Sequence, residues 1–437
     1  MNCCHRLLIL LLALAPIGAG HAIELASKEI FIPSSTPGVR INGYAYYSET
    51  EGTKMIRQYG QQTVSDKSDV AYQEVSLDNG KTWKPLDVIV TNRPLEEGTW
   101  RHGIRGGFAD PDQGLLINIL TRGVFPTDNP LEGMTQWTLH YRLSRIDANG
   151  EPILLYQSPI LESGRDSTPE SPLTGVTIGH NAAMIGDMTC AMVKIDSGEV
   201  LQPVQISPTG PDGHFHNPGG GYTYHNSAVL IGKWNDRKTI DWTLSQLVVA
   251  DPEKTTRGLL EPTVSQFDDG RILMVMRASN DKRPELPSYR WYSVSEDRGR
   301  TWSEAQPWTY TNGENFFSPS SCSMLLKHSN GKTYWIGNIN PENSHGNLPR
   351  YPFLIGEVDP ESLLLVKDSL CTLDDRQEGD WERLLLSNFF AQEDRVSHEI
   401  VVYMSPLFRK VPEPTADGKK PPLDWTADLY RYRVDVD

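Results

Sequence analysis

Short apolar runs separated by turn-forming residues recur along most of this 437-residue chain. Valine, isoleucine, leucine, tyrosine and tryptophan gather in the runs, and glycine, proline, asparagine and aspartate stand between them. The clearest runs are residues 114–120, 137–143, 271–277 and 399–404. Strands are short, whereas a helix needs a longer pattern with a period near 3.6 residues, and we find no long pattern of that kind. The sequence therefore predicts an all-β fold.

The end of the chain carries one more strand signal. Residues 428–436 alternate between apolar and polar side chains, as a half-buried strand does. A segment rich in proline and lysine precedes it at 409–423 and predicts an exposed loop. A second irregular segment, rich in glycine and histidine, covers residues 203–226 and predicts a loop on one face of the fold.

Two distant octapeptides follow one pattern, Ser-x-Asp-x-Gly-x-Thr-Trp. They are residues 76–83 and 295–302. Each fits a tight hairpin turn, because the aspartate can accept hydrogen bonds from nearby backbone N–H groups and the glycine tolerates a positive φ. The tryptophan then lies on the outgoing strand, beneath the turn.

The repeated octapeptide resembles the Asp-box of sialidase-like β-propellers, which is a structural turn. The resemblance implies a six-bladed β-propeller with both turns on its outer rim, away from the ligand site. The length agrees, because six four-stranded blades need roughly this many residues in one closed domain. The C-terminal strand would close the ring by pairing with N-terminal strands. We find no linker and expect one domain over residues 23–437.

Residues 1–22 predict a secretory signal peptide. The segment has a short basic start that ends in Arg6, continues through an apolar run at 7–16 and ends in Gly-His-Ala. The run is too short to span a bilayer, and no later segment reaches that length. We therefore expect a secreted or periplasmic protein that does not insert into a membrane.

The formal net charge of the chain is −15 at pH 7. Such a chain repels phosphate backbones, so we expect no nucleic-acid partner, and basic residues that handle an anionic ligand must be concentrated locally. Without the signal peptide three cysteines remain, which allow at most one disulfide: Cys190, Cys322 and Cys371. We expect a monomer without a cofactor.

Residues 261–277 carry the strongest hairpin signal. Two strand-like runs flank an Asp-Asp-Gly turn at 268–270, so Glu261 and Arg277 should face each other at the open end of the hairpin. From the pattern alone, the pair is an ordinary structural ion pair. Sialidases place a glutamate and an arginine in this arrangement. The resemblance implies that Glu261 supports the catalytic nucleophile and that Arg277 binds the carboxylate of the substrate.

Two further residues match the first sialidase blade. That blade begins with Arg-Ile-Pro, and this chain has Arg40-Ile-Asn42 at the corresponding place. The resemblance makes Arg40 the first arginine of a carboxylate clamp, with Asn42 in place of the proline. In the loop that follows, Asp66 matches the acid/base aspartate, and Asp69 lies close behind it in the sequence.

Arg350 matches the third arginine of the sialidase clamp. Three guanidiniums suit one carboxylate, because each offers planar, bidentate donors that a lysine does not reproduce. We expect Arg40, Arg277 and Arg350 to point into one depression near the ring axis, with Glu261 beside Arg277.

The nucleophile of the family has no counterpart here. Sialidases use a tyrosine from a Tyr-Ser motif near the end of the chain, whereas the matching stretch at 383–390 contains no tyrosine. Tyr403 belongs to the next predicted strand. We expect residues 387–389 to occupy the nucleophile position without a phenol from elsewhere. Catalysis would then use Asp66 and Glu261 directly, an activated water, or a nearby histidine.

Histidine and tyrosine side chains cluster in the middle of the chain. His180, His225 and Tyr224 are candidates for the base and acid of a β-elimination on a uronic acid, in which an arginine neutralises the carboxylate. His214 and His216 could also converge with His225 on a divalent metal. The alternatives are solvated loop residues and buried imidazoles, and we predict no metal site.

The sequence thus predicts a secreted, sialidase-like exo-glycosidase that acts on a terminal, carboxylate-bearing sugar of a glycan. Asp66 and Glu261 would be its catalytic carboxylates, and the three arginines its clamp. Two alternatives remain. One is a polysaccharide lyase that acts on uronic-acid glycans with a His/Tyr pair, and the other is a carbohydrate-binding propeller without catalysis.

Overall fold

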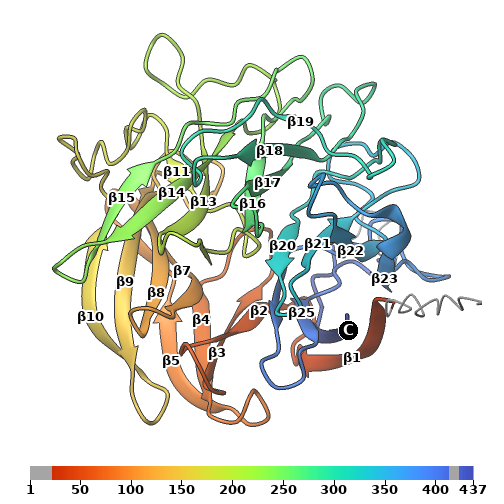
Figure 1. The fold of residues 1–437 in the computed structure, drawn as a ribbon, viewed down its shortest axis with the longest axis horizontal. Helices are drawn as coiled ribbons and strands as arrows, with labels where there is room; N and C mark the ends of the chain where they lie inside the picture. The colour runs from red at the N-terminus through yellow and green to blue at the C-terminus, as the bar shows by residue number, and fades with distance from the viewer. Residues whose placement is uncertain (1–21, 413–422, 437) are drawn as a thin grey trace, which may run out of the picture.

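The structure is a computed structural model that describes residues 22–412 and 423–436. Its strands form six antiparallel sheets, arranged as blades around a central axis (Figure 1). This is the six-bladed β-propeller that the sequence predicted. The expected signal peptide lies outside the described residues except for Ala22. In the described part of the chain, no helix is long and apolar enough to cross a membrane.

The first two blades come from the N-terminal part of the chain. The first blade contains β2 (Arg40–Tyr47), β3 (Met55–Gln62), β4 (Val70–Ser76) and β5 (Lys84–Val90). The second contains β6 (Asn92–Leu95), β7 (Gly98–Asp110), β8 (Leu115–Phe125), β9 (Thr138–Ile146) and β10 (Pro152–Pro159). In both blades, consecutive strands pair with one another, as in a meander.

The third and fourth blades follow in the same manner. The third contains β11 (Ala183–Met184), β12 (Val193–Lys194), β13 (Val200–Ile206), β14 (Asn226–Trp234) and β15 (Ile240–Leu244). The fourth contains β16 (Leu260–Gln266), β17 (Ile272–Arg277), β18 (Trp291–Ser295) and β19 (Gln306–Pro307). The predicted loop at 203–226 lies mostly between β13 and β14.

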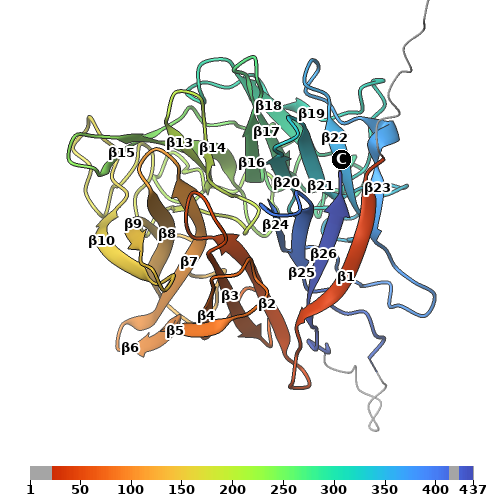
Figure 2. The ribbon, with the colours of Figure 1, turned by 60° about the horizontal axis from the view of Figure 1, so that its bottom comes forward.

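The last two blades complete the ring. The fifth contains β20 (Met324–Lys327), β21 (Thr333–Asn338), β22 (Phe353–Val358) and β23 (Cys371–Asp374), with a 3-10 turn η1 (Lys367–Ser369) before β23. The sixth contains β24 (Phe389–Glu393), β25 (Ile400–Met404), β26 (Leu429–Asp435) and β1 (Glu24–Ile32). The N-terminal β1 pairs with the C-terminal β26, which closes the ring as predicted (Figure 2).

Apolar side chains fill the space between neighbouring blades. Trp242 packs in a cluster shared by the second and third blades, and Trp308 and Trp335 pack between the fourth and fifth. All three are almost fully buried. Burying a large apolar side chain contributes about 1.5–3 kcal/mol. The packed blades therefore form a rigid scaffold for the loops at the ends of the strands.

Both octapeptides form the same turn. Oγ of Ser76 accepts from the backbone N–H of Gly80 at 2.9 Å, and the carboxylate of Asp78 accepts from Thr82. Ser295 and Asp297 repeat these contacts in the second copy. The turns connect the third and fourth strands of their blades, β4–β5 and β18–β19. Because adjacent strands are antiparallel, these turns lie at the opposite end of the blades from the β3–β4 and β17–β18 connections.

Candidate active site

Five segments that are far apart in the sequence bring polar side chains together at one end of the ring. Arg40 begins β2, Arg277 ends β17, and Glu261 lies near the start of β16. Arg350 comes from the β21–β22 connection, and Asn388 directly precedes β24. The four charged side chains are buried, with exposed fractions between 6% and 8%. Buried charges are costly without partners, so their contacts define the site.

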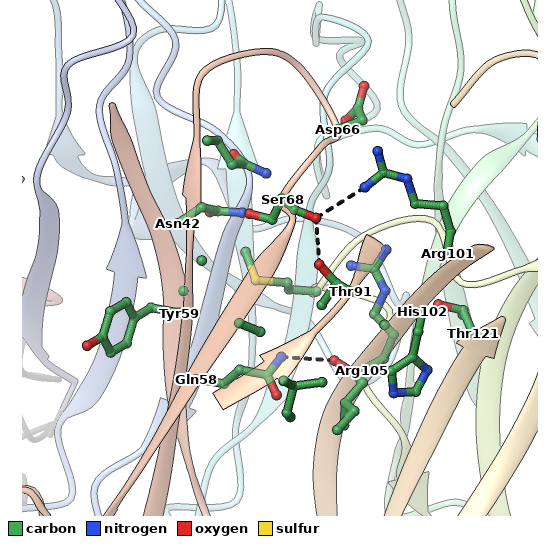
Figure 3. A pocket seen from close by; sticks show the side chains of 18 of the residues that line it. Asn42, Gln58, Tyr59, Asp66, Ser68, Thr91, Arg101, His102, Arg105 and Thr121 are labelled. Carbon is green, nitrogen blue, oxygen red and sulfur yellow. Dashed lines mark hydrogen bonds between the residues drawn. The ribbon is translucent and has the colours of Figure 1, made fainter. Parts of the chain in front are cut away.

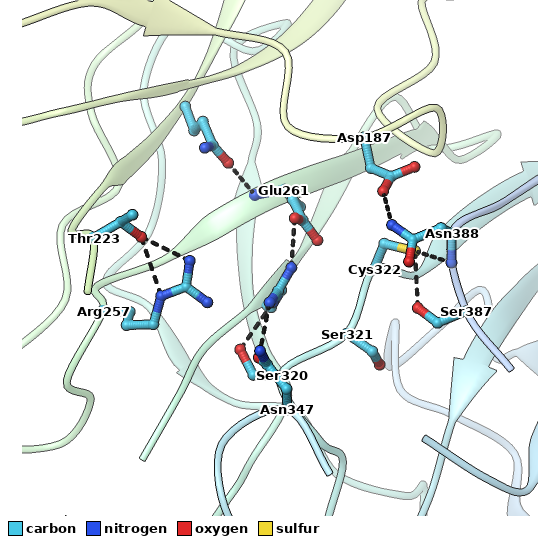
Figure 4. A network of polar contacts seen from close by, with 12 residues as sticks. Asp187, Thr223, Arg257, Glu261, Ser320, Ser321, Cys322, Asn347, Ser387 and Asn388 are labelled. Carbon is cyan, nitrogen blue, oxygen red and sulfur yellow. Dashed lines mark hydrogen bonds and ion pairs between the residues drawn. The ribbon is translucent and has the colours of Figure 1, made fainter. Parts of the chain in front are cut away.

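Glu261 and Arg277 form the ion pair that the hairpin predicted. Nη1 of Arg277 donates a hydrogen bond to Oε1 of Glu261 at 2.5 Å (Figure 4). The register between β16 and β17 shifts after Leu260, and Glu261 has a φ of 48°. A residue with a Cβ rarely adopts that backbone conformation, and such strain tends to collect at functional sites.

Arg277 and Arg350 lie against the same two residues. Nε of Arg277 donates to Oγ of Ser320 at 2.8 Å, and Nη2 of Arg350 donates to the carbonyl oxygen of Ser320 at 3.0 Å. Asn347 accepts from both arginines, through its side chain at 3.1 Å and its backbone carbonyl at 3.1 Å. Burial and the neighbouring Arg277 charge lower the pKa of Arg350. The structure thus holds two guanidiniums close together despite their repulsion.

Arg40, which the resemblance made the first arginine of the clamp, also lies at this site. Burial lowers its pKa to about 10, while the nearby carboxylates of Asp187 and Asp66 oppose the shift and Arg350 adds to it. Its Nη1 donates to Gln62 at 3.4 Å, and its buried Nε has no hydrogen-bond partner. The structure therefore brings Arg40, Arg277 and Arg350 into one electrostatic group.

Asp187 belongs to the site although the sequence analysis missed it. It lies between β11 and β12, and its side chain points toward Asn388 (Figure 4). The residue before it, Gly186, has no room for a side chain, because a Cβ there would lie 2.4 Å from Cγ of Glu261. The backbone of Gly186, the residue before Asp187, therefore lies directly against Glu261.

The two buried carboxyl groups have pKa values shifted in opposite directions. Burial, followed by repulsion from Glu261, raises the pKa of Asp187 to about 6. Burial also disfavours the ionised form of Glu261, but the charge and hydrogen bond of Arg277 outweigh it and keep the pKa below the ordinary value. Asp187 therefore keeps its proton up to a pH of about 6, whereas Glu261 is ionised at that pH.

Asn388 links Asp187 to the arginines. Its Nδ2 donates to Oδ2 of Asp187 at 2.5 Å, and its Oδ1 accepts from Nη1 of Arg350 at 3.4 Å. Its backbone N–H donates to Sγ of Cys322 at 3.3 Å. The predicted stretch at 387–389 thus supplies an amide to the site. Tyr403 lies on β25 and is only 2% exposed, packed in the core.

A cavity of about 180 Å³ opens beside this group, between the first and second blades (Figure 3). Asp66 lines it and is exposed, with a φ of 59°. Arg105 also lines it and acts electrostatically on Asp187, so the cavity lies near Asp187. Asp69 accepts hydrogen bonds from Asn92 and Arg101.

The histidine and tyrosine candidates differ in their surroundings. His225 is fully buried, and burial and then the arginine charges lower its pKa to about 3. The Tyr224 hydroxyl donates to the Ala250 carbonyl oxygen at 3.3 Å inside the core. His180 is exposed and stacks on His214 with ring centroids 4.2 Å apart. Among the described residues, no three His, Cys, Asp or Glu side chains are grouped to hold a metal.

The three cysteines that follow the predicted signal peptide, Cys190, Cys322 and Cys371, are free thiols. Burial raises the pKa of Cys322 to about 12, so the thiol beside Asn388 is protonated.

Comparison with known proteins supports the fold. Residues 188–388 match the BNR repeat-like domain family. No curated protein sequence matches the chain. Among solved structures, it is similar to a Dyadobacter fermentans protein of unknown function, with a TM-score of 0.57 and 13% identity over 95% of this chain and 100% of that one.

Two enzymes of known activity share the fold. A sialidase from Streptococcus pneumoniae has a TM-score of 0.52 and 13% identity, over 92% of this chain and 70% of the other. An α-L-arabinofuranosidase from Fusarium graminearum has a TM-score of 0.50 and 11% identity, over 96% and 98%. The chain thus contains a BNR repeat-like domain and forms a six-bladed propeller that resembles those of sialidases.

Proposed function

We propose that this sialidase-like propeller is a glycoside hydrolase that removes an acidic sugar from the end of a glycan. One observation carries the proposal. Two buried carboxyl groups whose pKa values are shifted in opposite directions, Asp187 upward and Glu261 downward, share a site with three arginines. Glycosidases use such pairs of carboxyl groups, in which the surroundings separate the two pKa values.

The arginines favour a negatively charged substrate. The whole chain carries a formal charge of −15, yet Arg40, Arg277 and Arg350 gather in this one place. Only Arg277 is ion-paired among these three in the described structure. A carboxylate of the substrate would compensate the remaining positive charge and accept charge-assisted hydrogen bonds.

The chemistry follows from the protonation states. Asp187 donates its proton to the glycosidic oxygen as the bond from that oxygen to the anomeric carbon breaks. A water molecule attacks the anomeric carbon, and Glu261 accepts the proton that this water loses. The nearby negative charge of Glu261 also stabilises the positive charge that develops on the sugar ring.

Asp66 has a different place in this proposal. The sequence predicted it as the acid/base residue, and it lies at the exposed lining of the adjoining cavity, close enough to act electrostatically on Arg40. We assign the proton to Asp187 because its carboxyl group is buried beside Glu261 and its pKa is raised to about 6, whereas Asp66 is exposed at the lining of the cavity. Asp66 would contact the leaving group or the rim of the substrate.

The shared fold agrees with glycosidic bond cleavage, since one neighbour is a sialidase and another an arabinofuranosidase. A panel of glycosides tests the proposal, with terminal sialic acid, terminal uronic acids and neutral pentoses or hexoses, and with products identified by mass. We expect hydrolysis of an acidic member only. An unsaturated product that absorbs in the ultraviolet would identify a lyase. Binding of acidic glycans without any product would identify a non-catalytic propeller.

A further inference from the structure

Arg257 is a fourth arginine beside the site, and neither the sequence analysis nor the proposed mechanism uses it. It lies four residues before Glu261 and is only 4% exposed. It forms no ion pair with any described residue, and its buried Nη1 has no hydrogen-bond partner. A buried donor without a partner is costly and calls for an explanation.

The surrounding chain holds this guanidinium in one orientation. Oγ1 of Thr223 accepts from Nε at 3.1 Å and from Nη2 at 2.7 Å (Figure 4). The Tyr222 ring covers the guanidinium, with its centroid 3.7 Å from Cζ. One hydroxyl oxygen therefore accepts from two of the three guanidinium nitrogens, Nε and Nη2, whereas Nη1 has no hydrogen-bond partner.

The glycine-rich loop before Tyr222 packs directly on this arginine. A Cβ on Gly221 would lie 2.5 Å from Cγ of Arg257, and one on Gly219 would lie 2.4 Å from the Thr256 carbonyl oxygen. Only glycine permits this approach. The loop at 203–226 is thus built onto the site at this point.

Arg257 also lies within electrostatic reach of the catalytic group. Its charge interacts with those of Arg277 and Glu261, and burial with the Arg277 charge lowers its pKa to about 10. Asp281 is the other nearby acid, but its Oδ1 accepts from the Thr256 hydroxyl and forms no ion pair with Arg257. Two buried guanidiniums, Arg257 and Arg277, therefore lie near each other with only one carboxylate bonded to them.

We propose that Arg257 binds a second oxyanion of the substrate, a carboxylate or a sulfate ester, beside the acidic group held by the three-arginine clamp. The inference rests on the proposed function, because it assumes that an acidic sugar occupies the site. Tyr222 is 47% exposed, so its ring both fixes the guanidinium and presents an aromatic surface to the sugar that carries the second anion. The preferred substrates are then glycans with two acidic groups close together.

Calorimetric titration with matched ligands tests this site. The ligands are glucuronic acid, O-sulfated glucuronic acid and a dimer of uronic acids, and the proteins are wild type, Arg257→Gln and the surface control Arg283→Gln. We expect wild type and the control to bind a doubly acidic ligand at least tenfold more tightly than glucuronic acid, since hydrogen bonds to charged groups are strong. Arg257→Gln should reduce that preference to less than threefold while its affinity for glucuronic acid stays within threefold.

The three ligands also identify the anion. A preference for the sulfated ligand indicates a sulfate ester, and a preference for the dimer indicates a carboxylate on the neighbouring sugar. Equal weakening of all ligands in Arg257→Gln would mean that the arginine is only structural, and it would overturn the proposal. If that variant does not fold, Tyr222→Ala replaces it, because half of that side chain is exposed, and it should also lose the preference.

Inorganic sulfate separates this proposal from the proposed function. Sulfate should raise the melting temperature of wild type more than that of Arg257→Gln, whatever the protein hydrolyses. Sulfate binding through Arg257 without hydrolysis of any acidic glycoside would overturn the hydrolase and keep the anion site. Hydrolysis of acidic glycosides with the same sulfate effect in both proteins would overturn the anion site alone.

Discussion

Asn388 donates a hydrogen bond from Nδ2 to Oδ2 of Asp187 at 2.5 Å, and the two residues are 201 positions apart in the sequence. The contact joins the third blade to the start of the sixth across the centre of the ring. Asn388 has a φ of 59°, so the residue that makes this contact has an uncommon backbone conformation. The amide oxygen of Asn388 also accepts from Arg350, so Asn388 links the proposed proton donor to one of the three arginines.

Asp187→Asn should make the protein more stable at neutral pH. Below a pH of 3.8, the ordinary pKa of an aspartate, the carboxyl group is protonated in both the folded and the unfolded protein. Between pH 3.8 and about 6, only the folded protein keeps this proton. The free energy of unfolding therefore falls as pH rises through this window, by about 3 kcal/mol in total. Asparagine does not titrate, so the variant should not show this fall in the free energy of unfolding. Urea denaturation should show equal stability at pH 3.5 and a more stable variant at pH 7.5. A less stable variant at pH 7.5 would contradict the raised pKa.

Turnover should decline as pH rises above about 6, because Asp187 must hold a proton to act as an acid and its pKa is raised to about 6. The profile of kcat/KM against pH on an acidic glycoside measures this descending limb. Asp66→Asn is the matched control and should keep the same limb. A rate that rises between pH 6 and 8 would show that the essential group acts as a base.

Arg277 and Glu261 should be strongly coupled in stability. Arg277→Met leaves the Glu261 carboxylate buried without its partner, which typically costs about 3–5 kcal/mol. The double variant Arg277→Met/Glu261→Gln should lose much less than the two single variants combined. Urea denaturation of all four proteins gives the coupling energy. Additive losses would mean that the ion pair contributes nothing as a pair.

Gly186→Ala should impair catalysis more than folding. The new Cβ would lie 2.4 Å from Cγ of Glu261 and 2.7 Å from Oε1 of Gln205, so the carboxylate must move. We expect kcat/KM to fall at least tenfold. Gly232→Ala is the control, because its Cβ would crowd apolar side chains of β13 and β15 instead. It should lower the melting temperature and keep activity well below that temperature. Unchanged activity in Gly186→Ala would show that the position of Glu261 is not critical.

The parts of the structure set by local sequence were predictable. The octapeptide turns depend on contacts within eight residues, and the pairing of Glu261 with Arg277 depends on one hairpin. Asp187 was missed because its neighbours come from other blades and no local pattern marks an irregular segment. Tyr224 and His225 suit catalysis by residue type, but a bridge between His225 and Gly258 places them in the core. Chemical type alone does not reveal on which side of a strand a residue lies.

The proposed roles of the two aspartates are separated by one measurement, kcat/KM of Asp187→Asn and Asp66→Asn on the same acidic sugar with a poor and a good leaving group. A leaving group that needs no proton does not depend on the acid. We predict that Asp187→Asn loses at least a thousandfold with an alkyl leaving group and much less with dinitrophenol. Asp66→Asn should stay within tenfold on both. A thousandfold loss in Asp66→Asn, with Asp187→Asn active on the alkyl glycoside, would contradict the assignment of the proton to Asp187.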